Sequence, residues 1–476
     1  MPFPIPVPKI YNITDGTFFP LKLSCFCNVE KWQKYADIFC DMFKKAHGIS
    51  LSKEKGGVEI YEDNSVKPGQ YKIEVDGMVK LYASDDEGIR YALASALQLP
   101  ERNGTVAKKI HIEDYPDKEH RAFMLDLSRE WHTFDKILKY IDVCFVAKIK
   151  YLQLHFADTQ RYTLPSKAFP KLSTENESYT FEEIAYLNEY AKDRGVVIIP
   201  EYEGPGHAKR FNDVYPEVFS DKEDMGEEVP ECVYLDDTVI CAGSRIAFEA
   251  NKTLLKEIAD MFPDSPYIHI GGDEANFEKW NNCSVCRKYM EEKGISDVKE
   301  LYCDYIARLT EYIITLGRIP MVWEGFPKSG TNRIPKETIV VAWDASYQLP
   351  GELLESGFKI INACWKPLYL VPGSHPKFRS WGIDEIYDWN IYNWQNIFDC
   401  SKATLNPVTI SPSDNMIGTM MCAWEGNYES EITRVGECLP IMSERVWNIN
   451  KRYDRMGIYP GHENIMRIIF RVIQDR

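Results

Sequence analysis

The chain has 476 residues, of which 44% are hydrophobic and 27% are charged, as is typical of a globular protein long enough for two domains. Its formal net charge of −16 argues against nucleic acids and anionic membrane surfaces as partners. The sequence has no run of about 18 apolar residues, so we expect no transmembrane helix and no membrane partner.

Residues 1–115 are predicted to form a small α/β domain. Apolar residues recur at helical spacing in some segments and alternate with polar residues, as in half-buried strands, in others. Asp76-Gly77 is a typical hairpin turn between two strands, and residues 84–87 form a capping sequence before a helix. The predicted elements are a helix over 29–47, strands over 58–61, 71–75 and 79–83, and a helix over 88–99. Because no catalytic set converges in this region, we interpret it as supporting structure.

A polar, turn-rich stretch over 101–117 marks the domain boundary, and residues 116–476 are predicted to form a (β/α)8 barrel of the α/β class. Apolar strands there alternate with amphipathic helices, for example over 247–262 and 298–316. The predicted strands cover 123–127, 151–156, 196–201, 267–271, 320–323, 339–343, 359–363 and 418–424. A doubly wound open sheet is the alternative, but no glycine-rich phosphate loop follows the first strand.

The most informative stretch ends the fourth predicted barrel strand and reads His269-Ile270-Gly271-Gly272-Asp273-Glu274. Glycine allows close approach to the backbone, and two carboxylates at a strand end are suited to acid/base chemistry on a polar substrate. The two acids could instead cap the next helix. Capping would explain one acid but not the histidine and the two glycines, so we favour a catalytic interpretation.

Polar and aromatic residues also follow the other predicted strands, where the functional groups of a barrel gather. Three strands end in a tryptophan and an acid: Trp323-Glu324, Trp343-Asp344 and Trp424-Glu425. The first three strands are bracketed or followed by Arg121, Asp126, Arg129, His155, Asp158, Glu201 and His207. Each residue alone has an ordinary structural explanation, but together they predict a pocket with aromatic walls for a neutral, hydroxyl-rich ring.

Residues 121–447 resemble the catalytic domain of family 20 of the glycoside hydrolases, the β-N-acetylhexosaminidases. The matching stretches are Arg121 to Arg129, Leu154 to Asp158, Arg194 to His207 with its Pro200-Glu201-Tyr202-Glu203-Gly204-Pro205-Gly206-His207, His269 to Glu274, and Ser443 to Trp447. Residues 88–98 resemble part of the small α/β domain that usually precedes this barrel. The resemblance implies an exo-acting, retaining hydrolase whose partner is a glycan with a terminal N-acetylhexosamine.

The resemblance also implies a substrate-assisted mechanism, in which the 2-acetamido oxygen of the substrate attacks the anomeric carbon and forms an oxazolinium ion. Glu274 would be the general acid and base, Asp273 would accept the acetamido N–H, and Tyr369 would donate to the acetamido carbonyl. Substrate binding would fall to Arg121, at the C3 and C4 hydroxyls, and to His207, Trp323, Trp343, Trp424, Glu425 and, at a neighbouring subsite, Trp389. Supporting residues would be His155, Asp158, Glu201 and His269.

Three positions differ from the family pattern: Val371 replaces an aspartate, Glu425 follows Trp424 directly, and Glu203 replaces an aspartate before Pro-Gly-His. The first two positions normally contact the C4 and C6 hydroxyls, so the choice among N-acetylglucosamine, N-acetylgalactosamine and a C6-modified sugar stays open. Alternatives to the exo-hydrolase are a non-catalytic sugar-binding relative and a disaccharide-releasing enzyme. A metal-dependent hydrolase using His155, His207, His269 and Asp273 is disfavoured, because these residues lack metal-type spacing.

The cysteine content and the first residues bear on location and metals. The 13 cysteines are odd in number and scattered, which suits free thiols in a reducing cytosol. Met1 to Pro8 lacks the features of a signal peptide, so we expect a cytoplasmic protein, and a homodimer is compatible with the sequence. Cys283-x-x-Cys286 has half of a zinc spacing, but no second pair follows, so we expect no metal and no cofactor.

Overall fold

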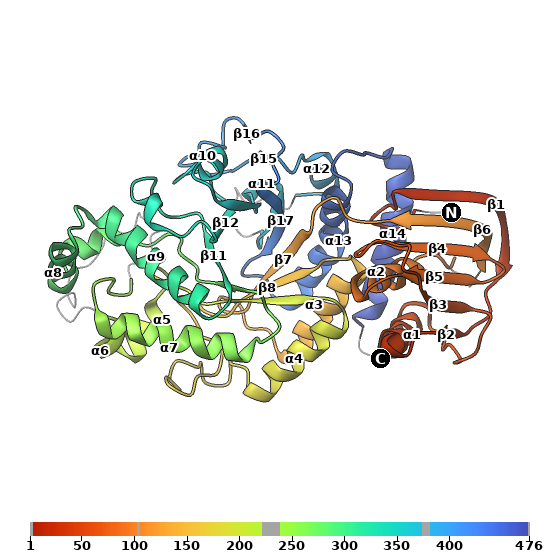
Figure 1. Ribbon diagram of the computed structural model, residues 1–476, viewed down its shortest axis with the longest axis horizontal. Coiled ribbons are helices and arrows are strands. Elements are labelled where there is room, and N and C mark those ends of the chain that lie inside the picture. The colour runs from red at the N-terminus through yellow and green to blue at the C-terminus, as the bar shows by residue number, and fades with distance from the viewer. Residues whose placement is uncertain (1–2, 102–104, 221–238, 374–380, 475–476) are drawn as a thin grey trace.

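The computed structural model describes residues 3–101, 105–220, 239–373 and 381–474, and for 107 and 108 it describes the backbone alone. Two sheets organise this part of the chain (Figure 1). The first has six strands in the order β1-β6-β4-β5-β3-β2. Its strands are β1 (Ile10–Pro20), β2 (Cys25–Cys27), β3 (Val58–Glu62), β4 (Tyr71–Asp76), β5 (Val79–Ala83) and β6 (Thr105–Asp114).

The turn and the helix cap predicted for the N-terminal unit are present, but two long strands were not predicted from the sequence. Gly77, with φ of 73°, makes the turn between the antiparallel strands β4 and β5. The Asp85 side chain accepts from the Gly88 N–H and caps α2 (Asp86–Ala96). The missed strands β1 and β6 pair with each other; β1 is mostly exposed, and β6 lies within the stretch interpreted as a boundary. The predicted first helix is present as a short 3-10 turn, η1 (Glu30–Trp32), followed by α1 (Gln33–His47).

The second sheet is a closed barrel of eight parallel strands, which confirms the predicted fold class. Its strand order is β7-β8-β9-β10-β11-β12-β13-β17, and pairing of β13 with β17 closes it. The strands are β7 (His120–Asp126), β8 (Tyr151–His155), β9 (Val197–Glu201), β10 (Tyr267–His269), β11 (Ile319–Trp323), β12 (Ile339–Ala342), β13 (Lys359–Asn362) and β17 (Met416–Ala423). Each lies at a predicted position, because buried parallel strands are continuous apolar runs bounded by turns.

Helices connect and surround the barrel strands. They are α3 (Phe134–Val146), α4 (Phe181–Asp193), α5 (Lys209–Val214), α6 (Pro216–Phe219), α7 (Arg245–Met261), η2 (Phe277–Asn281), α8 (Ser284–Lys293), α9 (Val298–Thr315), η3 (Thr331–Arg333), α10 (Pro350–Glu355), α11 (Trp365–Leu368), α12 (Ile383–Asp388) and α13 (Tyr428–Trp447). Short strands β14 (Tyr369–Leu370), β15 (Asn393–Trp394) and β16 (Val408–Thr409) lie in the later loops. No helix of the described ranges is long and apolar enough for a membrane crossing.

The last helix, α14 (Arg455–Val472), lies between the two sheets and contacts segments that are distant from it in sequence. It packs against α1 of the N-terminal unit and against α3 and α13 of the barrel (Figure 1). The Arg471 guanidinium donates to the Ala46 carbonyl at 3.2 Å, and the Asn464 amide donates to the Gln98 carbonyl at 3.0 Å. The C-terminal helix is therefore shared by both units.

Arg121 is the second residue of β7 and lies at the amino end of this strand, which contradicts its predicted role as a ligand of sugar hydroxyls. The side chain is fully buried, and it donates to the carbonyls of Lys118, Glu119 and Lys148 and to the Tyr91 hydroxyl of α2. In a parallel barrel this end lies opposite the carboxyl ends of the strands. Arg121 therefore joins the barrel floor to the N-terminal unit.

We expect Arg121→Met to destabilise the protein, because it leaves several buried carbonyl oxygens without their charged donor. The free energy of unfolding should fall by roughly 3 kcal/mol, measured by urea denaturation. Arg333→Met is the control, because Arg333 is 39% exposed and its nearest acid, Glu300, is 3.6 Å away. An equal and small effect of both changes would contradict the structural role of Arg121.

Candidate active site

Two adjacent acids, Asp273 and Glu274, follow β10 at the mouth of the barrel. The backbone reaches them through Gly271 and Gly272, whose φ angles of 72° and 93° favour glycine. A Cβ at Gly271 would clash with the Glu203 carboxylate, so this position must be glycine for the segment after β10 to contact the segment after β9. Glu274 itself has φ of 44°, a sparsely populated conformation for a residue with a side chain. The local sequence thus holds both acids in a constrained, fixed geometry.

Asp273 is a buried carboxylate with unused hydrogen-bonding capacity. Its side chain is 14% exposed, and its buried Oδ1 has no hydrogen-bond partner among the described residues. Burial raises the pKa of Asp273 to about 6; His207 opposes this rise and Glu274 adds to it. A buried acceptor without a partner is costly, and such groups occur where a ligand supplies the donor.

Glu274 is the more exposed acid, with 32% of its side chain accessible, and it faces His207. Its Oε2 lies 3.4 Å from His207 Nε2, and His207 Nδ1 lies 3.3 Å from Asp158 Oδ1. Burial alone would lower the pKa of His207, but Asp158, Glu274 and Asp273 outweigh burial and hold it well above its usual value. A protonated imidazole therefore links the exposed acid to a buried one.

Glu201 anchors a second buried group directly behind this link. Its carboxylate lies 3.1 Å from His155 Nδ1 and 3.2 Å from His269 Nδ1, and it accepts from the Trp323 indole N–H at 2.6 Å. The other nitrogen of His155 lies 2.9 Å from Asp158. Burial alone would raise the pKa of Glu201, but His155 and His269 hold it below the usual range, so Glu201 stays ionised. The predicted supporting residues are therefore in mutual contact.

The four predicted metal ligands do not form one group: His155 lies with Glu201 and Glu203, whereas His207 and Asp273 lie with Glu274. His155 and His269 contact Glu201, whereas His207 lies between Asp158 and Glu274. Carboxylates that orient and charge the imidazoles suit an acid/base arrangement.

Four aromatic rings gather near the carboxyl ends of barrel strands: Trp323 ends β11, Trp343 follows β12, Tyr369 opens β14 and Trp424 follows β17. Trp343 and Tyr369 are parallel within 7° at a centroid distance of 6.2 Å. Trp424 lies 6.1 Å from Trp323 and 6.2 Å from Tyr369. Burial, together with charges that include Asp273, raises the pKa of Tyr369 well above its usual value, so its hydroxyl keeps its proton and can donate. These four rings include the three tryptophans that were predicted to form the aromatic walls of the pocket.

Arg129, rather than Arg121, is the arginine at the carboxyl end of β7. Its Nε donates to Asp158 at 2.8 Å, its Nη1 lies 3.4 Å from Glu425, and its guanidinium lies 4.8 Å from the centre of the Trp424 ring. Asp126 orients this corner, since its carboxylate accepts the backbone N–H groups of Arg129 at 2.9 Å and of Glu425 at 3.1 Å. The position of Arg129 after the strand was the sequence signal that could have identified this arginine as a substrate-binding candidate.

Trp389 does not join the aromatic group, which corrects its prediction as a subsite residue. It belongs to the apolar layer outside the barrel strands, is 7% exposed, and its indole N–H donates to the Asn393 carbonyl at 3.0 Å. Glu324 also has a structural role, because its buried carboxylate accepts backbone N–H groups of 344, 345, 347 and 348. Burial raises the pKa of Glu324 to about 7.

An acid pair, an imidazole link and aromatic walls therefore lie together at the mouth of an eight-stranded parallel barrel. The family model for the glycosyl hydrolase family 20 catalytic domain matches residues 119–449, and the chain belongs to that family.

Named relatives and solved structures are similar to the chain over most of its length. A protein of Porphyromonas gingivalis named beta-hexosaminidase is 28% identical over 370 residues, 71% of this chain and 47% of that protein. A human protein named beta-hexosaminidase subunit beta is 28% identical over 72% of this chain and 60% of that protein, so the chain spans only part of the length of these relatives. The structure of a Vibrio harveyi GH20 exo beta-N-acetylglucosaminidase in complex with N-acetylglucosamine has a TM-score of 0.82 at 21% identity, covering 98% of this chain and 78% of that one. A beta-N-acetylhexosaminidase structure from Bacteroides fragilis has a TM-score of 0.78 at 22% identity, covering 96% and 93%.

We expect Asp273→Asn to stabilise the protein at neutral pH. The pKa of Asp273 is about 6 in the folded state, above its ordinary 3.8. The contribution of Asp273 to the free energy of unfolding is therefore fully present below pH 3.8 and is lost as the pH rises through 6. The asparagine variant lacks this loss and should be more stable than the wild type by about 2 kcal/mol near pH 7.5, with a smaller difference near pH 5. Urea denaturation at both pH values measures this, and a difference that does not change with pH would contradict it.

Proposed function

We propose that this protein is an exo-acting, retaining β-N-acetylhexosaminidase that removes terminal β-linked N-acetylglucosamine or N-acetylgalactosamine by substrate-assisted catalysis. The observation that carries the proposal is the buried Asp273 Oδ1, which has no partner among the described residues and lies next to an exposed acid. An acetamido N–H is a donor of the right kind for this oxygen. A non-catalytic sugar-binding protein would not need the second acid, Glu274, beside it.

In the first step the acetamido oxygen attacks the anomeric carbon while the bond to the leaving oxygen breaks. Glu274 gives its proton to that leaving oxygen, and the product is an oxazolinium ion. In the second step Glu274 takes a proton from water, which attacks the same carbon and reopens the ring. Two inversions at the carbon give net retention. His207, 3.4 Å from Glu274, faces the carboxylate that is present between the two steps.

Asp273 and Tyr369 would hold the acetamido group in its reactive position. Ionised Asp273 accepts the N–H and balances the positive charge that develops on nitrogen, and this interaction is strongest in the transition state. The Tyr369 hydroxyl, which keeps its proton, donates to the acetamido oxygen. The Trp323, Trp343 and Trp424 rings would exclude water from the acetamido methyl and from the apolar face of the sugar.

Arg129 and Glu425, which lie beside Trp424, would bind the sugar hydroxyls. Glu425 is 53% exposed and pairs with Arg129 at 3.4 Å, so both can exchange this contact for hydroxyl groups. In this proposal Arg129 has the role that the family resemblance assigned to Arg121. Val371, where the family pattern has an acid, packs partly buried against the aromatic group and offers no hydrogen bond to a hydroxyl. The choice between C4 epimers would therefore depend on Arg129 and Glu425.

We expect Glu274→Gln to lower kcat/KM by about 100-fold to 10,000-fold on N-acetyl-β-glucosaminides with a poor leaving group, because no acid protonates the departing oxygen. The loss should be smaller on an aryl glycoside whose leaving group needs no proton. Initial rates on the two substrate types measure this.

Equal losses on both substrates would exclude Glu274 as the acid. Inhibition by a thiazoline analogue of the oxazolinium ion tests the substrate-assisted route separately. Binding of N-acetylglucosamine by the wild type without turnover of either glycoside would favour a sugar-binding protein instead.

We expect Arg129→Met to lower kcat/KM by about 100-fold, equivalent to the loss of about 2.7 kcal/mol of charge-assisted hydrogen bonding. Because Arg129 also contacts Asp158, a 4-deoxy glycoside is measured as well. Arg129→Met should cost less on that substrate if the guanidinium binds the C4 hydroxyl. Arg121→Met is the control, and its kcat/KM per folded molecule should match that of the wild type. Identical losses on both substrates would contradict a direct contact.

A further inference from the structure

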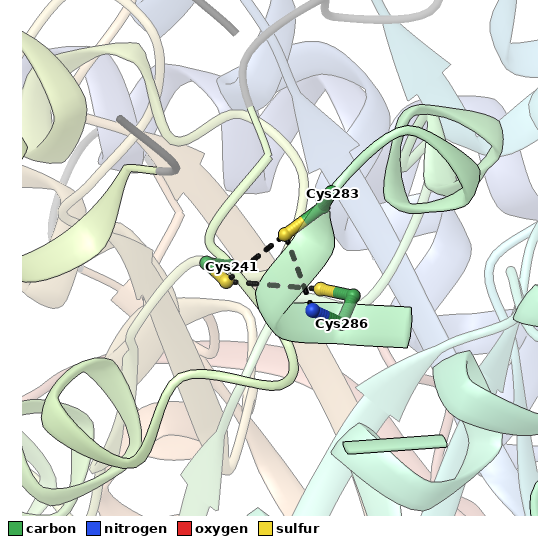
Figure 2. A group of neighbouring side chains, drawn as sticks. All are labelled: Cys241, Cys283 and Cys286. Carbon is green, nitrogen blue, oxygen red and sulfur yellow. Dashed lines mark hydrogen bonds between the residues drawn. The ribbon is translucent and has the colours of Figure 1, made fainter. Parts of the chain in front are cut away.

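Three cysteine sulfurs converge outside the barrel strands, between two segments that are distant in sequence (Figure 2). Cys241 lies just before α7, and Cys283 and Cys286 lie at the start of α8. Cys241 Sγ is 3.6 Å from Cys283 Sγ and 3.7 Å from Cys286 Sγ, and all three residues are buried. The third thiol thus reaches Cys283-x-x-Cys286 from more than 40 residues upstream.

The sulfur spacing fits shared coordination of one ion and not a disulfide. A disulfide bond requires about 2.05 Å between sulfurs. Thiolates bound to zinc at about 2.3 Å in tetrahedral geometry lie about 3.8 Å apart, from the bond length and the tetrahedral angle. The observed 3.6 and 3.7 Å are close to this edge length.

Backbone donors point at two of the three sulfurs, as in metal–thiolate sites. The Cys286 N–H donates to Cys283 Sγ at 3.3 Å, and the Gly243 N–H donates to Cys286 Sγ at 3.4 Å. Cys283 is the N-cap of α8, where the helix dipole favours negative charge. These hydrogen bonds orient the sulfurs and reduce the repulsion among thiolates.

The surrounding contacts fix the two segments against each other. The Trp280 indole N–H donates to the Ile240 carbonyl at 3.2 Å, and the Arg308 guanidinium donates to the Ala242 carbonyl at 2.6 Å. A Cβ at Gly243 would lie 2.7 Å from the Cys286 Cα, so only glycine permits this approach.

We propose that Cys241, Cys283 and Cys286 bind one zinc ion, which fastens the segment before α7 to the segment that follows the catalytic acids. Three thiolates and the N–H donors suit a soft divalent ion, and a donor outside the trio completes the tetrahedron. The site is structural, because η2, which begins at Phe277, separates it from Glu274. The sulfur positions and their backbone donors support this ion independently of the proposed hydrolase activity.

The test is the metal content of the full chain, produced with zinc in the medium and passed through gel filtration. We expect about one zinc per chain by elemental analysis, and thiolate-to-cobalt charge-transfer bands after exchange with Co²⁺. Cys241→Ser, Cys283→Ser and Cys286→Ser should each lose the ion and lower the Tm by several degrees. Cys303→Ser is the matched control, since this buried thiol donates to the Ser329 carbonyl at 3.2 Å and a hydroxyl can do the same.

A mercurial titration of the wild type covers the case in which the variants fail to fold. Modification of the thiols should release about one zinc per chain to a coloured chelator. The proposal is overturned if wild-type protein holds no more zinc than the Cys283→Ser variant or releases none, or if mass analysis shows Cys241 joined to Cys283 or Cys286 in a disulfide. Because metal content and spectra are measured, these outcomes do not depend on whether the hexosaminidase proposal holds.

Discussion

The buried charge of Glu201 is the constraint on which the rest of the site depends. An ionised carboxylate without access to water must be matched by donors and positive charge. Here Trp323 and Gln153 donate to Glu201, and the His155 ring lies 3.1 Å from it. This requirement fixes the ring of His155, which then orients Asp158, and Asp158 in turn positions His207 against Glu274. Charges deep in the barrel thus set the geometry of a side chain at its surface. Because each of these residues is positioned by its neighbour, the effects of substituting them on stability should be strongly non-additive.

The barrel was predictable from the sequence because its signals are local. Each of its strands is an apolar run of a few residues that ends in a polar or aromatic group, and no distant partner is needed to recognise it. Strand β1 carries no such signal, since it is exposed along most of its length and is stabilised by pairing with β6. The acid pair was identifiable for the same local reason, namely two glycines and two carboxylates at the end of one strand.

Of the errors, one was avoidable from the sequence and two were not. Arg121 and Arg129 bracket the same strand, and their order in the chain already indicates that the first lies at the floor and the second at the mouth. Trp389 is of a residue type that often binds sugars, but it packs outside the barrel strands. Cys241 lies far from Cys283-x-x-Cys286 in sequence, so a half motif was visible and its third member was not. Long-range pairings of this kind follow from tertiary structure alone.

The position of α14 has a consequence for the order in which the protein folds during synthesis. The N-terminal unit is made first, yet helix α1 finishes packing only when residues 455–472 arrive. The segment around Val7 likewise depends on late residues, because the Val7 N–H donates to the Glu444 carboxylate at 2.6 Å and the Val7 carbonyl accepts from the Asn448 amide at 2.8 Å. The face of α1 that packs on α14 therefore stays uncovered until late in translation. Chaperone dependence, rather than final stability, should be the property most sensitive to shortening of this helix.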